Sequence, residues 1–127
     1  MPILDHLEPR AVFSCFEQLC AIPHGSGNTK AISDYLVRFA AEHQLRCIQD
    51  AHNNVIIFAP GTPGYESAAP VILQGHMDMV CEKNSDVEFD FDNDPIRTHI
   101  DGGWVRAEGT TLGADCGIGM AAEGHLW

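Results

Sequence analysis

The residues best suited to chemistry follow a short apolar run at positions 71–73. His76 and Asp78 stand two residues apart just after this run. Side chains two apart on an extended segment lie on the same face, so these two would project together. A neutral imidazole is a good metal ligand, and a carboxylate beside it fixes its tautomer and raises its basicity. The pair therefore predicts a metal or acid–base site at the end of the run.

A third candidate, Asp115, lies in the glycine-rich stretch 109–119. A carboxylate in such a loop can bridge two metal ions, and its small neighbours let the backbone approach closely. We expect this loop to return to the sheet edge where His76 and Asp78 lie, since ligands bind at strand ends in α/β sheets. The alternative, equally natural chemically, is that Asp115 caps the helix that follows.

Two other chemistries could use residues close to these candidates. Residues 117–122 fit G-x-G-x-x-A, but no strand precedes them and no acidic residue follows at the distance a dinucleotide site needs. The thiols of Cys81 and Cys116 would need a base such as His76 to act as nucleophiles. The sequence favours small buried thiols equally well.

The elements that must position these residues are predicted from periodicity. A helix over 9–21 would bury the residues that recur at i, i+4, i+7 and i+8, which are Val12, Phe16, Leu19 and Cys20. A second helix over 29–44, with Asn28 as its N-cap, would bury Ile32, Leu36, Phe39 and Ala40.

The rest of the chain is predicted to be mainly strand and loop. Strands are expected at 46–49 and 55–59 around a turn at 52–54, with a buried strand at 71–73. An acidic surface loop over 82–94 and a hairpin over 96–107 follow, and a helix starts at about Gly117. This order predicts an α/β fold, a mixed sheet with flanking helices.

Composition limits the function. A chain of 127 residues with 45% apolar residues is sufficient for one domain. Its net charge of −11 disfavours nucleic acid and anionic membranes as partners. Five cysteines without a C-x-x-C pair favour reduced thiols over a disulfide framework or zinc finger. With neither a signal peptide nor a membrane-spanning run visible, we expect a cytoplasmic protein.

Four segments, 14–24, 71–80, 94–96 and 109–121, together resemble one family. They look like the N-terminal part of the aminoacyl-histidine dipeptidases, also called Xaa-His or β-alanyl-histidine dipeptidases, of the M20 family of two-zinc metallopeptidases. The resemblance implies that residues 1–122 are the incomplete N-terminal portion of a zinc-dependent exopeptidase catalytic domain. It leaves 123–127 as an atypical end.

The resemblance also implies roles. His76 would bind zinc, Asp115 would bridge two zinc ions, Asp78 would orient His76 in the catalytic site, and the bond after Asp115 would be cis. Manganese or cobalt would also suit these ligands. In the family, a general-base glutamate, the remaining ligands and a dimerisation domain lie further along the chain, and full-length members form homodimers.

Two functions from different classes therefore remain. The first is zinc-dependent hydrolysis of Xaa-His dipeptides, with these 127 residues inert on their own because they lack a general base. The second is a short, non-catalytic acidic α/β module that binds a partner or a single metal.

Overall fold

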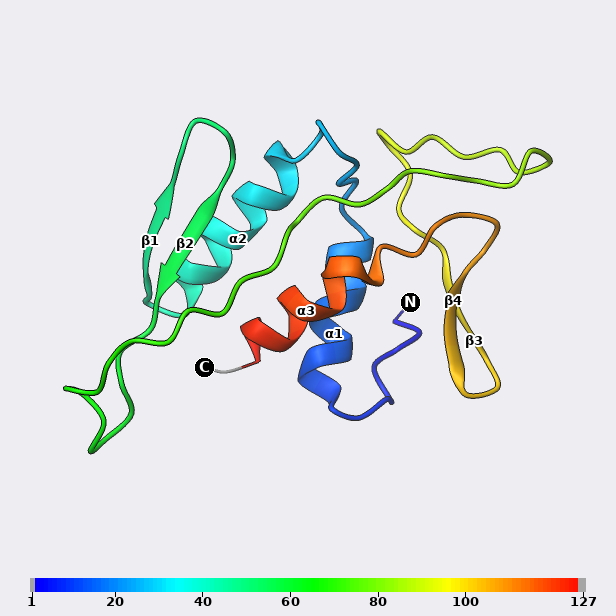
Figure 1. Ribbon diagram of the computed structural model, residues 1–127. Coiled ribbons are helices and arrows are strands. Elements are labelled where there is room, and N and C mark those ends of the chain that lie inside the picture. The colour runs from blue at the N-terminus through cyan, green and yellow to red at the C-terminus, as the bar shows by residue number, and fades with distance from the viewer. Residues whose placement is uncertain (1, 126–127) are drawn as a thin grey trace.

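The computed structural model describes residues 2–125, which form an α/β chain of two helices, four strands and a final helix (Figure 1). The elements, in chain order, are α1 (Arg10–Cys20), α2 (Lys30–Glu42), β1 (Arg46–Gln49), β2 (Val55–Phe58), β3 (Thr98–Asp101), β4 (Trp104–Ala107) and α3 (Ala114–Gly124). Of the predicted atypical end 123–127, residues 126 and 127 lie outside the described residues.

The hydrophobic core lies where α1 and α3 pack together near the centre of Figure 1. α1 buries the four residues predicted from its periodicity, Val12, Phe16, Leu19 and Cys20. α3 contributes Met120 and Ala121 to the same cluster, and Leu4 packs onto it from the N-terminal segment. The packing is close, because a Cβ added at Gly117 would lie 3.1 Å from the Phe16 ring.

α2 packs on the β1–β2 hairpin, which has the predicted strands and antiparallel register. The predicted N-cap Asn28 is wrong, because Thr29 holds that position. Asn28 instead lies in a turn, where its N–H donates to the Gly25 carbonyl at 2.8 Å. In the turn that joins β1 to β2, Asn53 has a φ of 70°, a left-handed conformation that Asn tolerates in turns.

The predicted buried strand at 71–73 is wrong. Residues 71–78 form no strand, and the side chains of Val71 and Ile72 are 84% and 88% exposed. A strand needs a neighbour to accept and donate its main-chain hydrogen bonds, and within residues 2–125 β2 pairs with β1 alone. Residues 70–75 and β2 instead line an apolar groove of about 720 Å³, with Leu36, Phe39 and Met120 also in its wall.

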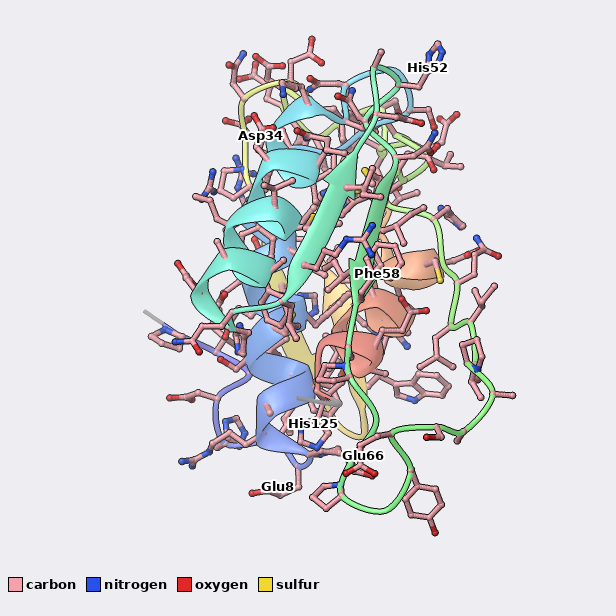
Figure 2. All side chains as sticks on the ribbon, turned by 90° about the vertical axis from the view of Figure 1, so that its left-hand side faces the viewer. Glu8, Asp34, His52, Phe58, Glu66 and His125 are labelled. Carbon is pink, nitrogen blue, oxygen red and sulfur yellow. The ribbon has the colours of Figure 1, made fainter. Side chains whose placement is uncertain are left out.

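Figure 2 shows how the groove arises: beyond Glu66 the chain runs upward beside β2, past Phe58, without pairing with this strand. Leu36 and Phe39, which the helical pattern predicts to be buried, stay half-buried for the same reason. The groove therefore leaves one side of the β1–β2 hairpin and part of α2 open.

The second hairpin, β3–β4, lies within the predicted hairpin over 96–107 and pairs antiparallel. The acidic stretch 82–94 is a loop with one isolated bridge, between Lys83 and Thr110. Among the described residues no helix is long and apolar enough to cross a membrane. The described strands thus form two separate antiparallel hairpins rather than one sheet.

Truncating the core should show where the stability lies. Leu19 is 1% exposed, so Leu19→Ala is expected to lower the free energy of unfolding by about 2–5 kcal/mol in urea titrations. Ile56→Ala is the matched control, because Ile56 is 55% exposed on β2 and should cost less than about 1 kcal/mol. Equal losses for the two variants would contradict this placement of the core.

Candidate metal centre

Main-chain hydrogen bonds fix the segment that carries His76 and Asp78. The Met79 N–H donates to the His24 carbonyl at 3.0 Å, and the Ser26 N–H donates to the Met79 carbonyl at 3.2 Å. These bonds make Gly25 and Met79 a parallel bridge. A Cβ at Gly25 would lie 2.6 Å from the Cys81 sulfur, so any larger residue there would require the Cys81 side chain to move.

The predicted alternation of side chains follows from this anchoring, although the segment is not a strand. Met79 is 3% exposed and Met77 packs against the core. His76 and Asp78 lie on the other side, with side chains 49% and 40% exposed. The alternation needs only an extended backbone, which the bridge to Gly25 supplies.

The start of α3 is the second segment that forms the site, after residues 76–79. Gly113 precedes it in a left-handed conformation, with a φ of 81°, and a Cβ there would lie 3.0 Å from the Met79 sulfur. Asp115 and Cys116 have non-helical backbone angles, so the regular helix begins at about Gly117, as predicted. The Asp115–Cys116 peptide bond is cis, as the family resemblance implies.

The three predicted site residues, His76, Asp78 and Asp115, come together. His76 Nδ1 lies 3.1 Å from Asp78 Oδ1 and 2.9 Å from the Asp78 carbonyl oxygen. On the opposite edge of the ring, Nε2 lies 2.9 Å from Asp115 Oδ1. The alternative role of Asp115 as an N-cap is not observed, because its carboxylate faces His76 and no side-chain cap hydrogen bond forms at the start of α3.

This arrangement favours a positive charge on His76. A neutral imidazole donates from one nitrogen only, whereas both nitrogens of His76 face oxygen acceptors. The hydrogen bond to Asp115 is the main cause that raises the pKa of His76. A divalent cation on Nε2 would replace that proton and leave the Nδ1–H with Asp78.

Sequence reasoning missed one residue of this network, Ser26. Its hydroxyl donates to Asp78 Oδ2, and this bond is the main cause that lowers the pKa of the Asp78 carboxyl. Ser26 lies 52 residues before Asp78, in a glycine-rich break that has no motif of its own. Only the Gly25–Met79 bridge brings the two together.

The donor atoms suit a divalent metal ion. The ligand atoms of His76, Asp115 and Cys116 all lie within 4.8 Å of one another. Imidazole nitrogen and carboxylate oxygen are both common ligands of zinc. The Asp115 side chain is 96% exposed, so one of its oxygens can face His76 while the other stays open to a second ion.

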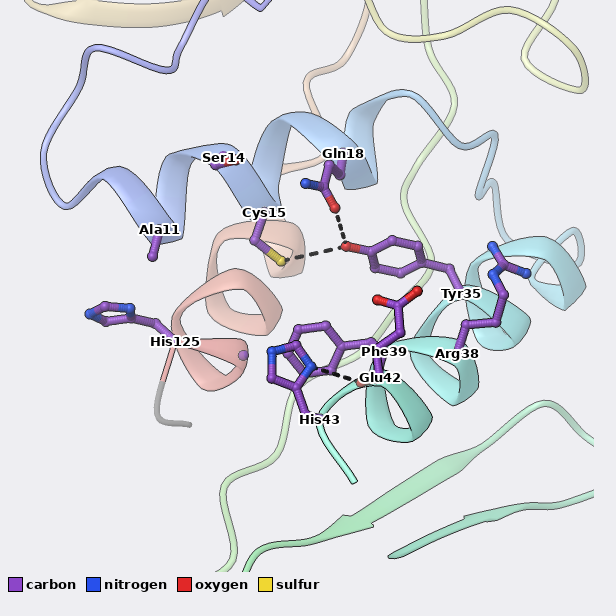
Figure 3. Close-up of a pocket in the computed structure, with 11 residues that line it drawn as sticks. Ala11, Ser14, Cys15, Gln18, Tyr35, Arg38, Phe39, Glu42, His43 and His125 are labelled. Carbon is purple, nitrogen blue, oxygen red and sulfur yellow. Dashed lines mark hydrogen bonds between the residues drawn. The ribbon is translucent and has the colours of Figure 1, made fainter. Parts of the chain in front are cut away.

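A separate cavity of about 530 Å³ lies between α1, α2 and the end of α3, and it is less suited to chemistry (Figure 3). Its Tyr35 hydroxyl donates to Gln18 at 2.7 Å and lies 4.0 Å from the Cys15 sulfur. Burial raises the pKa of both Cys15 and Tyr35, which keeps them protonated and weakly nucleophilic.

The fold and the donor set thus define an α/β chain with a candidate centre for a divalent cation. No family model matches the chain. The chain is 45% identical over 122 residues to the cytosol non-specific dipeptidase of Escherichia coli (strain K12), covering 96% of this chain and 25% of that protein.

Its structure is also similar to the crystal structure of aminoacylhistidine dipeptidase from Vibrio alginolyticus. The TM-score is 0.93 at 44% sequence identity, over 98% of this chain and 26% of that one. The resemblance to the aminoacyl-histidine dipeptidases is therefore confirmed, and the α/β fold with flanking helices is that of a segment of such an enzyme. This chain spans about a quarter of the length of these relatives.

The coupling between His76 and Asp115 can be tested without metal. Asp115→Asn replaces the carboxylate whose hydrogen bond chiefly raises the pKa of His76, so that pKa should fall toward the usual value of about 6.5. NMR titration of the imidazole signals measures it. Asp92→Asn, an exposed acidic residue in the 82–94 loop, is the control and should leave His76 unchanged. An unchanged His76 in Asp115→Asn would contradict the contact.

His24 provides a second test through stability. It is 3% exposed, its Nδ1–H donates to the Ile22 carbonyl at 2.6 Å, and burial is the main cause that lowers its pKa. In the folded state it therefore binds a proton less readily than in the unfolded state. Stability from this residue is present above a pH of about 6.5 and is lost as the pH falls below it.

The corresponding experiment compares urea unfolding at neutral pH and near pH 5. His24→Gln should lose less stability between the two conditions than the parent chain, whatever its stability at neutral pH. His52→Gln, an exposed residue in the β1–β2 turn, is the control and should follow the parent chain. Identical pH dependence in the parent chain and His24→Gln would show that His24 titrates normally.

Proposed function

We propose that this chain provides part of the metal site of a zinc-dependent dipeptidase acting on Xaa-His dipeptides. One observation carries the proposal: His76 presents Nε2 to the Asp115 carboxylate at 2.9 Å while its Nδ1 is held by Asp78. The names of the two relatives, a non-specific dipeptidase and an aminoacylhistidine dipeptidase, support the reaction class.

Each residue has a distinct role in this proposal. His76 and Asp115 would hold the metal, and the exposed Asp115 carboxylate would also be available to a second ion. Asp78 is the positioning residue: it holds the Nδ1–H, so that the Nε2 lone pair points toward the ion. Ser26 in turn fixes the Asp78 carboxylate. When bound, zinc would polarise the peptide carbonyl and activate water.

The proposal also includes inertness of these 127 residues by themselves. A catalytic zinc takes about three protein ligands together with water, and hydrolysis needs a base for that water. Among the described residues, His76 and Asp115 are the two ligands that the family resemblance assigns. The general base and remaining ligands, together with the homodimer, would belong to the additional length that the relatives have.

Two further aspects belong to the same proposal. Manganese or cobalt would also suit an imidazole and a carboxylate, so zinc is the first choice rather than a requirement. The name of the Escherichia coli relative places that enzyme in the cytosol, which supports a cytoplasmic location for this chain. Reduced cysteines fit that compartment.

Zinc binding tests the proposal directly by isothermal titration of the purified chain. Asp78→Asn should weaken zinc binding about 10- to 100-fold, the usual effect of removing a carboxylate that orients a histidine ligand. His76→Ala should weaken it at least as much, and His52→Ala is the control with unchanged affinity.

Two results would contradict the proposal. Zinc affinity that ignores both His76→Ala and Asp78→Asn would favour the non-catalytic binding module instead. Measurable hydrolysis of β-alanyl-histidine by the purified, zinc-loaded chain would overturn the inertness.

A further inference from the structure

Cys116 is the one cysteine that falls in a metal-type donor group within residues 2–125. Its sulfur, His76 and Asp115 place their ligand atoms within 4.8 Å of one another. Neither the sequence motifs nor the proposed dipeptidase site uses this thiol. We propose that Cys116 is a third ligand, so that the ion held by His76 and Asp115 is thiophilic and is bound through nitrogen, oxygen and sulfur. This inference rests on the proposed function, whose metal site it extends.

The surroundings of the Cys116 sulfur are compatible with a metal ligand that lies below the exposed carboxylate of Asp115. A Cβ added at Gly75 would lie 3.0 Å from the Cys116 sulfur, and one at Gly119 would lie 2.7 Å from it. The sulfur therefore sits between the residue preceding His76 and the first turn of the regular helix. The absence of a side chain at these two glycines leaves room for the sulfur. Cys116 is half-buried, whereas Asp115 is exposed.

The spacing is within reach of real coordination. Zinc bonds of about 2.0 Å to nitrogen and 2.3 Å to sulfur, arranged tetrahedrally, put neighbouring donor atoms about 3.5 Å apart. The present upper limit of 4.8 Å leaves roughly 1 Å to close. His76 Nε2 and Asp115 Oδ1 are already 2.9 Å apart, so the Cys116 sulfur is the donor atom that has to approach.

The charge balance also favours one ion. On binding, Cys116 releases its proton to solvent and becomes a thiolate, while His76 binds as the neutral imidazole. One thiolate and one carboxylate then neutralise one divalent cation. Thiolate selects zinc, cobalt(II) or cadmium over magnesium, calcium and manganese. A site of this kind holds its ion firmly with three protein ligands and keeps the fourth position for water.

Cobalt(II) is the probe that distinguishes a sulfur ligand, because thiolate coordination gives an intense sulfur-to-cobalt charge-transfer band in the near ultraviolet. The reduced full chain is titrated with cobalt(II) while the absorption spectrum is recorded. We expect this band together with visible d–d bands, at a stoichiometry of one ion per chain. Zinc should remove both sets of bands by displacing cobalt.

The variants separate the ligand from its neighbours. Cys116→Ser should lose the charge-transfer band and bind cobalt at least tenfold more weakly, with visible d–d bands retained at higher cobalt concentration. Cys81→Ser is the matched control, because the Cys81 sulfur lies beside Gly25 and away from α3. This variant should leave the charge-transfer band intact. Far-ultraviolet circular dichroism confirms that each variant is folded before titration.

The outcomes distinguish this inference from the proposed function. Visible bands that depend on His76, without a charge-transfer band and unchanged by Cys116→Ser, would overturn the sulfur ligand and leave the His76–Asp115 site standing. A charge-transfer band that survives Cys116→Ser but not Cys81→Ser would also overturn it. Cobalt spectra that are unaffected by His76→Ala would count against both proposals.

Discussion

The site depends on the short main-chain pairing between Gly25 and Met79. This pairing holds residues 76–79 extended where no sheet supports them, and it sets which side chains face the core. Met79 goes inward, and His76 and Asp78 stay at the surface. The same pairing places the Ser26 hydroxyl against Asp78. A few main-chain bonds therefore fix the orientation of the His76 imidazole, because they bring Ser26 to the Asp78 carboxylate, 52 residues further along the chain.

The other half of the site is positioned by close packing. α3 approaches α1 closely because Gly117 carries no side chain against the Phe16 ring. Gly113 approaches the Met79 sulfur in the same way. These two contacts place Asp115 opposite His76, since Asp115 lies between them in the sequence. The glycines thus serve the chemistry by permitting approach.

Local patterns predicted the elements well and the long-range contacts less well. The helical burial of Val12 and Phe16 and the pairing of His76 with Asp78 follow from side-chain periodicity. The meeting of Asp115 with His76 was expected from the family resemblance and from the tendency of sites to lie at strand ends. Ser26 had no local signal. The strand at 71–73 was wrong because an apolar run does not reveal whether a neighbouring strand exists to pair with it.

The open groove beside β2 also affects how copies of this chain behave toward one another. An unpaired strand edge beside exposed Val71 and Ile72 is a template for edge-to-edge pairing between chains. The net charge of −11 opposes this by mutual repulsion. Salt screens that repulsion over about 10 Å at 0.1 M without weakening apolar contact. The colloidal state of this chain is therefore set by ionic strength, with dilute low-salt solution favouring the dispersed form.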